Sequence, residues 1–192
     1  IGIYDGLSGQ LLYNLQVNKG PTYPLPANTG NPCLQAPPNI CTEYANYVTV
    51  QSLPARASGY VISYQRCCRN ATITNLNNPD DWGMTITTRI PPNDTCNSSP
   101  QWDSTPPIVL CSQEFLNIPV TCTDPDGDSL YYELCSLYHG GGKGQGGGFN
   151  TPQPNPPAPP PYTTIPYKAP NTTVNPIPGN PPLAMNPATG HL

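Results

Sequence analysis

Short stretches in which apolar and polar residues alternate recur through the first half of the chain, separated by prolines and glycines. In one stretch Tyr60, Ile62 and Tyr64 alternate with Val61, Ser63 and Gln65. Another places Met84, Ile86 and Ile90 against Thr85, Thr87 and Arg89. Successive side chains of a strand point to opposite faces, so this pattern predicts half-buried antiparallel strands within residues 44–53, 58–68 and 83–90.

The segments before these strands predict a hairpin and a loop. Residues 1–17 carry apolar residues on both sides of Asp5-Gly6 and Ser8-Gly9, which is typical of two short strands around a glycine-rich turn. Residues 20–43 contain six prolines. Because proline has no N–H to donate to a ladder, we expect an ordered loop there.

A second series of strands is expected after a proline-rich boundary at residues 99–107. Its members are "PIVLC", "FLNIPVTC" and "LYYELC", which end at residues 111, 122 and 135. The glycine run at 140–148 predicts a mobile segment. The following "PPAPPP", residues 156–161, predicts an extended polyproline connector packed by Tyr162 and Tyr167, with a ligand for an SH3-like groove as the alternative.

Composition supports an all-β chain and narrows its partners. The 192 residues include 29 prolines and 17 glycines, which leave almost no window suited to a helix. Charged residues are 9% of the chain and the net charge is -4, so nucleic acid is not an expected partner. No apolar run reaches the length of a membrane span, so no direct membrane insertion is expected.

Eight cysteines in a proline-rich chain with two histidines indicate disulfides and an oxidising, extracellular compartment. They are Cys33, Cys41, Cys67, Cys68, Cys96, Cys111, Cys122 and Cys135. The pairing is open, with Cys33 to Cys41 favoured as the most local bridge. Neighbours within a strand point to opposite faces, so Cys67 and Cys68 are predicted to pair with different partners.

"DPDGDSL", residues 124–130, sets Asp124, Asp126 and Asp128 at alternate positions. This spacing suits a calcium site in a β-turn, because a hard cation needs several anionic oxygens on one side of a turn. The alternative is a turn without an ion, in which the carboxylates accept hydrogen bonds from turn amides. An EF-hand is excluded, because its closing glutamate position falls on Cys135.

No catalytic residue can be assigned, so the chain is predicted not to be an enzyme. The exposed tip of a hairpin does not provide the paired carboxylates of a hydrolase. His191 lies at the end of the sequence, and His139 borders a glycine run that is not expected to hold it in place.

Several motifs together resemble a known group of proteins. They are "YVISYQRCCRNATITNL", "SSPQW", "PPIVLC", "DPDGDSLYYELC", "PPPYTTIPY" and "LAMNPATGHL", which span roughly residues 44–192. The chain is similar in these motifs to the large secreted surface proteins of gliding Bacteroidota. These are adhesin-like chains of tandem Ig-like, PKD-like and cadherin-like modules, exported by the type IX system.

The resemblance implies two Ig-like or cadherin-like β-sandwich modules with long Pro/Gly-rich loops and disulfides. We expect an N-terminally incomplete module at 1–103 and a C-terminally incomplete one at 104–192, within a longer chain that starts before Ile1 and continues after Leu192. The implied function is a structural or adhesive element at the cell surface, in contact with neighbouring domains, copies of itself or surface glycans. The alternatives are a self-assembling filament subunit and a carbohydrate-binding module that uses Trp82 and Trp102.

Glycosylation is expected in such a protein. Ser104 and Ser129 follow aspartate and fit the O-glycan pattern that the resemblance implies. The Asn-x-Ser/Thr acceptor pattern occurs at four asparagines, which are Asn70, Asn93, Asn97 and Asn171.

Overall fold

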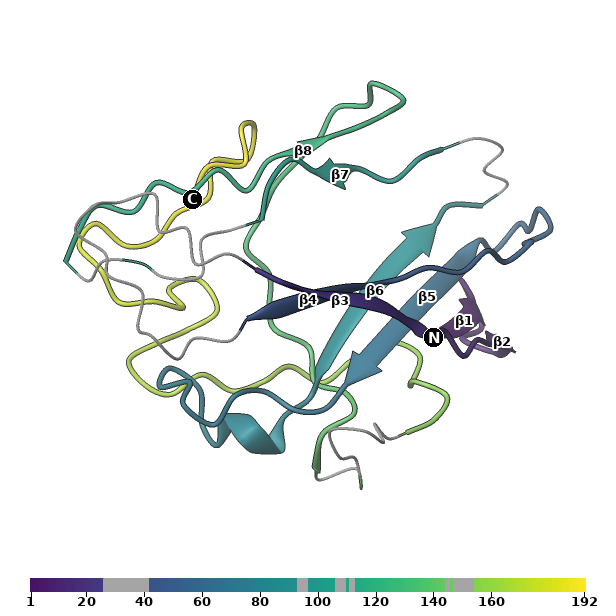
Figure 1. The fold of residues 1–192 in the computed structure, drawn as a ribbon, viewed down its shortest axis with the longest axis horizontal. Helices are drawn as coiled ribbons and strands as arrows, with labels where there is room; N and C mark the ends of the chain where they lie inside the picture. The colour runs from purple at the N-terminus through teal and green to yellow at the C-terminus, as the bar shows by residue number, and fades with distance from the viewer. Residues whose placement is uncertain (26–41, 93–96, 106–109, 111–112, 144–145, 147–153) are drawn as a thin grey trace. The chain divides into compact units, whose positions relative to one another are not determined.

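The computed structural model describes residues 1–25, 42–92, 97–105, 110, 113–143, 146 and 154–192. Strands and irregular segments make up this part of the chain, which contains one short 3₁₀ helix, η1 (Pro79–Asp81), and no α-helix (Figure 1). The strands are β1 (Gly2–Asp5), β2 (Leu11–Asn14), β3 (Lys19–Pro24), β4 (Glu43–Tyr47), β5 (Tyr60–Arg66), β6 (Met84–Ile90), β7 (Gln101–Trp102) and β8 (Cys122–Thr123). The predicted all-β class is therefore confirmed.

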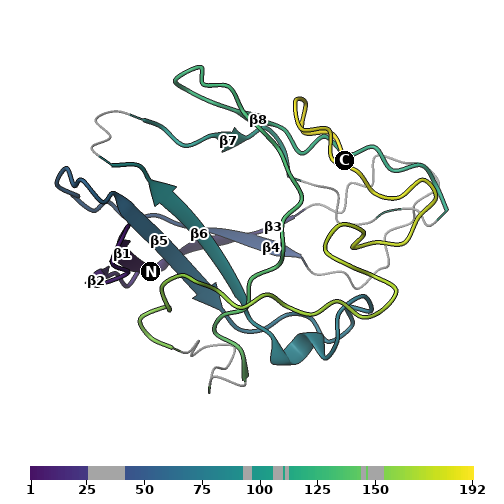
Figure 2. The ribbon, with the colours of Figure 1, turned by 180° about the vertical axis from the view of Figure 1, so that it is seen from behind.

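Four strands form the main sheet, in the order β2-β1-β5-β6 with every neighbour antiparallel. Both views show β5 and β6 as its two long, adjacent strands (Figure 1, Figure 2). The register places Gly2 opposite Ser63 and Gln65 opposite Thr85. The N-terminal hairpin and the strands predicted within 58–68 and 83–90 are confirmed.

A two-stranded ribbon pairs β3 with β4. The prediction that a loop begins at residue 20 was wrong for its first residues, because β3 includes Pro21 and Pro24. The register shifts between Lys19 and Thr22, at the position of Pro21. A two-stranded ribbon leaves one edge of each strand unpaired, so a residue without an N–H costs it little. The predicted Cys33–Cys41 bridge lies outside the described residues.

The second series of strands is shorter than the sequence predicts. Among the residues described there, the strands are β7 and β8, and "LYYELC" is not in a strand. Most of "PIVLC" lies outside the described residues. Residues 118–120 instead pair with 190–192, where Ile118 and Leu192 exchange two backbone hydrogen bonds of 3.0 Å. The Tyr132 hydroxyl bonds the backbone of Cys122, and the Tyr132 N–H donates to the Pro187 carbonyl at 3.0 Å.

The chain divides into two compact units, and each unit is built from three separate segments. Unit 1 comprises Ile1–Gln16, Ser52–Asn97 and Leu134–Leu183, and unit 2 comprises Val17–Gln51, Ser98–Glu133 and Ala184–Leu192. The predicted modules 1–103 and 104–192 do not coincide with these units. Residues 134–183 belong to the same unit as the main sheet, because they hydrogen-bond to its strands and to the segment between β5 and β6.

The apolar core of unit 1 combines strand residues with residues from these later segments. Ile3, Tyr4, Tyr60 and Val61 are buried in the sheet. Leu76 is 4% exposed and Ile165 is 3% exposed. Leu76 forms a backbone bridge with Tyr167, two residues after Ile165. The Ile165 N–H donates to the Leu137 carbonyl at 2.9 Å, so residues far apart in the sequence close one core.

We predict that Leu76→Ala lowers the free energy of unfolding by about 2–4 kcal/mol, because it leaves a cavity in this core. Chemical denaturation followed by circular dichroism measures the change. Leu7→Ala is the matched control, since Leu7 is 81% exposed and its loss should change stability by less than about 0.5 kcal/mol. Equal effects of the two substitutions would contradict this placement of the core.

Candidate functional site

One face of the main sheet carries a group of buried side chains with polar atoms, next to the apolar Val61, and we call this group the polar face. It consists of Tyr4 on β1, Ser63 and Gln65 on β5, and Thr85 on β6, which are 3%, 0%, 4% and 8% exposed. On the opposite face Ile62 and Tyr64 are only half-buried, and Ile86 is 58% exposed. The alternation predicted from the sequence is present, but the polar positions are more deeply buried than several apolar ones.

The proline-rich segment 156–161 supplies the partners of the polar face. The Ala158 N–H donates to Gln65 Oε1 at 3.0 Å, and Ser63 Oγ donates to the Ala158 carbonyl at 3.1 Å. The Tyr4 hydroxyl donates to the Pro157 carbonyl. Three side chains of the sheet thus hydrogen-bond the backbone of Pro157 and Ala158. Each buried polar group among them therefore has a partner.

The start of the glycine run completes the polar face. Gln65 Nε2 donates to Thr85 Oγ1 at 3.0 Å, and Thr85 Oγ1 donates to the His139 carbonyl at 2.8 Å. Gly140 is buried, and a Cβ added there would lie 2.5 Å from the Gln65 amide carbon. The prediction of a mobile run was therefore wrong for residues 140–142, which are buried. At Gly140 glycine alone fits against Gln65.

The sequence predicted that the proline-rich segment is continuously extended, and the structure differs from this prediction. The chain bends at residues 154–156 and again at 160–161, and Pro157 between the bends is buried. Tyr162 packs near Tyr138, with ring centroids 5.4 Å apart, which agrees with a segment anchored by aromatic side chains.

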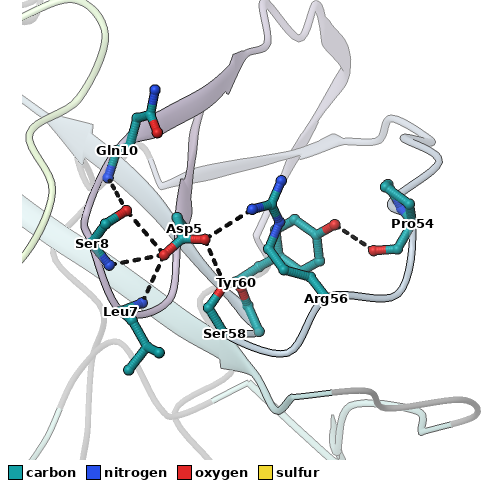
Figure 3. Close-up of polar contacts among 9 residues, drawn as sticks. Asp5, Leu7, Ser8, Gln10, Pro54, Arg56, Ser58 and Tyr60 are labelled. Carbon is teal, nitrogen blue, oxygen red and sulfur yellow. Dashed lines mark hydrogen bonds and ion pairs between the residues drawn. The ribbon is translucent and has the colours of Figure 1, made fainter.

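The carboxylate of Asp5 organises the turn after β1 (Figure 3). Its Oδ1 accepts from the Leu7 N–H at 3.0 Å, the Ser8 N–H at 2.8 Å and the Ser8 hydroxyl at 3.0 Å. Its Oδ2 accepts from the Ser58 hydroxyl at 2.5 Å and from Arg56 Nη1 at 3.0 Å. Oδ1 therefore closes the β1–β2 turn, and Oδ2 joins this turn to the segment before β5.

These donors hold the pKa of Asp5 far below its ordinary range, with the Ser58 hydroxyl as the largest cause and the Ser8 N–H next. The Arg56 guanidinium also lies over the Tyr60 ring, 5.7 Å from its centroid, and the Tyr60 hydroxyl donates to the Pro54 carbonyl at 2.5 Å (Figure 3). The alternating pattern predicts only a turn at Asp5-Gly6 and gives no role to the carboxylate. The Asp-x-x-Ser spacing of Asp5 and Ser8 could have indicated this role, because such a side chain can accept from the N–H three residues on.

The aspartate turn shows the hydrogen bonds of the alternative without an ion. Asp124 Oδ1 accepts from the Asp126 N–H at 2.9 Å and from the Asp128 N–H at 3.2 Å. Asp126 Oδ2 accepts from the Ser98 N–H at 2.5 Å. Gly127 adopts a φ of 80°, the left-handed conformation that such a turn needs. No three His, Cys, Asp or Glu residues gather as a metal site in the part of the chain that the structure describes.

The cysteines differ from the sequence prediction where they are described. Cys67 and Cys68 form a disulfide with each other, because β5 ends at Arg66 and the strand argument for opposite faces does not extend to them. Cys122 is half-buried and Cys135 is exposed, and neither is bonded to another described cysteine. Cys33, Cys41, Cys96 and Cys111 lie outside the described residues.

His139 is held more firmly than its neighbouring glycines suggested. Its backbone N–H donates to the Thr163 carbonyl at 2.8 Å. Its ring packs edge-on against the Trp82 ring, with the ring centroids 4.9 Å apart. Burial, and then the charge of Arg69, lowers the pKa of His139, so the ring is neutral near pH 7. Its buried Nδ1 has no hydrogen-bond partner among the described residues, whereas a catalytic histidine is ordinarily oriented by a carboxylate.

The remaining predicted sites lie on the surface or outside the described residues. Ser104, Ser129, Asn70 and Asn97 are exposed, Asn171 is half-buried, and Asn93 lies outside the described residues. Trp102 is 66% exposed, as a stacking platform requires. Trp82 is not free in this way, because its Nε1 donates to the Asn77 carbonyl at 2.7 Å and its ring contacts His139. The described residues include no helix that is long and apolar enough for a bilayer.

We predict that Asp5→Asn makes the protein less stable at pH 7 and less sensitive to acid. A folded pKa below the unfolded value contributes stability that is complete above about pH 5 and is lost as the pH falls below about 4. Wild-type melting temperatures should therefore fall more steeply between about pH 5 and pH 2 than those of Asp5→Asn. Glu133→Gln, which removes an exposed carboxylate, is the control and should retain the wild-type slope. Parallel curves for wild type and Asp5→Asn would contradict the network in Figure 3.

We predict that Asp124→Ala lowers the stability of unit 2 by about 1 kcal/mol in calcium-free buffer, because two turn amides lose their acceptor. Thermal melts with and without added calcium measure the effect, with Asp128→Ala as the control that keeps both hydrogen bonds to Asp124 Oδ1.

Calcium binding remains a prediction for this turn. A melting temperature that rises with calcium in wild type but not in Asp126→Ala would support it, and an unchanged Asp124→Ala would contradict the amide-bonded turn.

Comparison with known proteins gives no relative for this chain. No family model matches it, and no curated protein or solved structure does either.

Proposed function

We propose that the chain is a non-enzymatic structural module of a larger extracellular protein at the cell surface. The observation that carries the proposal is that the chain covers its own polar face. A sheet surface with buried hydroxyl and amide groups would otherwise offer a place for a polar ligand. Here Ser63 and Gln65 bond the backbone of Ala158 instead, so these groups serve the fold.

Other polar groups are used in the same way. Both carboxylate oxygens of Asp5 accept hydrogen bonds from turn and loop residues, and Asp124 Oδ1 accepts from two amides of its own turn. Asn186 closes the "NPATG" turn, where its Oδ1 accepts from the Ala188 N–H at 3.0 Å and the Thr189 N–H at 3.2 Å. Irregular backbone fixed by local side chains suits a spacer that must keep one shape.

The motif resemblance to surface proteins of gliding Bacteroidota supports the location and an adhesive role. The exposed positions of Ser104 and Ser129 are compatible with glycan attachment in such a protein. Ig-like or cadherin-like identity of the modules is part of this proposal, and the antiparallel main sheet is consistent with it.

Antibodies against the purified chain test the location. We expect them to label intact cells of the source organism, and we expect protease treatment of intact cells to remove the label. The control is an antibody against a cytoplasmic enzyme, which should label only lysed cells. Labelling that requires lysis would refute the proposed location.

The second candidate is a self-assembling filament subunit, which the outer edge of β6 favours. Thr85 directs its N–H away from β5, to the Tyr138 carbonyl at 3.1 Å. By the alternation of an antiparallel ladder, Thr87 and Arg89 face the same edge, and their backbone groups pair with no described residue. Such an edge can accept a strand from another chain.

Electron microscopy and light scattering of the purified chain separate the two candidates. A spacer is expected to form no filaments at any concentration tested. Filaments that form with wild type but not with Thr87→Pro, which removes the N–H at this edge, would favour the subunit. Thr88→Ser, with a backbone that faces β5, is the matched control.

A further inference from the structure

The hydrogen bonds from the polar face to segment 156–161 end on backbone atoms of the segment. Tyr4 and Ser63 donate to the carbonyls of Pro157 and Ala158, and Gln65 Oε1 accepts from the Ala158 N–H. Contacts of this kind depend on the path of the bound backbone and not on its covalent connection to the sheet. The same three bonds could be made by an identical segment from another molecule.

The register of the segment is fixed by its single donor. Five of the residues 156–161 are proline, so Ala158 alone carries an N–H, and Gln65 Oε1 lies 3.0 Å from it. A shift by one residue would place a proline at Gln65 and leave a buried amide oxygen unpaired, which is costly. The polar face therefore selects a backbone in which a residue with an N–H is flanked by prolines on both sides.

Neither partner in this contact is charged. Residues 154–162 contain no acidic or basic side chain, and the four residues of the polar face are neutral. Two copies of a chain with a net charge of -4 therefore meet no like-charge pair within this contact. The binding energy should come from hydrogen bonds and buried proline surface, and it should depend little on salt.

We propose that the polar face is a binding surface for proline-rich peptides, and that it can take residues 155–161 of a second copy in place of the chain's own. If two copies exchange segments reciprocally, they form a closed dimer. If only one segment is exchanged, one segment and one polar face remain free to bind further copies. This inference does not rest on the cellular location proposed above.

A complementation experiment on the full chain tests the exchange. Ala158→Pro keeps the polar face but removes the N–H from the segment. Gln65→Leu keeps the segment but removes the acceptor from the face. We expect each variant alone to sediment as a monomer and an equimolar mixture to contain a heterodimer, because only the mixture can form one intact contact between molecules. Ala158→Ser keeps the N–H and is the control. A mixture of Ala158→Ser with Gln65→Leu should contain no more heterodimer than a mixture of wild type with Gln65→Leu. A mixture of the two folded variants that remains monomeric would overturn the proposal.

A peptide experiment gives an answer even where a variant does not fold. Two fluorescent peptides are used, one with the sequence of residues 154–162 and one with proline in place of Ala158. We expect the first to bind the wild-type chain in an anisotropy titration, and the second to bind roughly tenfold more weakly or less, because the Gln65 amide oxygen loses its donor. The affinity of the first peptide should be unchanged between low and high salt. Equal binding of the two peptides, or no binding of the first, would overturn the proposal.

Discussion

A polar side chain that is removed from water must find a hydrogen-bond partner, and this constraint determines how unit 1 is built. Ser63 is fully buried and Gln65 nearly so, and both lie on the face of β5 that a half-buried strand would ordinarily fill with apolar residues. A proline-rich segment is a suitable cover, because it offers many carbonyl acceptors and few donors. Here it offers one donor, the Ala158 N–H, which lies at the one acceptor provided by Gln65.

This constraint explains why unit 1 is assembled from distant segments. Residues 134–183 are needed to cover a sheet formed by residues 2–90, since Ala158 satisfies Gln65 and the His139 carbonyl satisfies Thr85. The same packing explains the buried Gly140, because a Cβ there would lie 2.5 Å from the Gln65 amide carbon. Irregular segments thus act as structural parts of the fold, and the module proposed for the cell surface owes its shape to them.

The sequence predicted local features well and long-range pairing poorly. Alternation at residues 60–65 located β5, and Asp5-Gly6 with Ser8-Gly9 located the N-terminal turn, because both depend on near neighbours. The burial of Ser63 could not be predicted, since its partner is 95 residues away and no local pattern points to it. The disulfide between Cys67 and Cys68 was missed because the end of β5 was placed two residues too late. For a bridge between adjacent residues the closed loop is minimal, so it constrains the unfolded chain far less than the long-range bridges that the sequence suggested.

The Ala158 N–H donates to the buried side chain of Gln65, and amide hydrogen exchange of the full chain, followed by NMR, tests this bond directly. We predict that the Ala158 amide exchanges as slowly as the hydrogen-bonded amides of β5, and that Gln65→Leu accelerates its exchange while the hairpin of β1 and β2 remains protected. Exchange of Ala158 at the rate of an unstructured peptide in the wild-type chain would show that segment 156–161 does not cover the polar face.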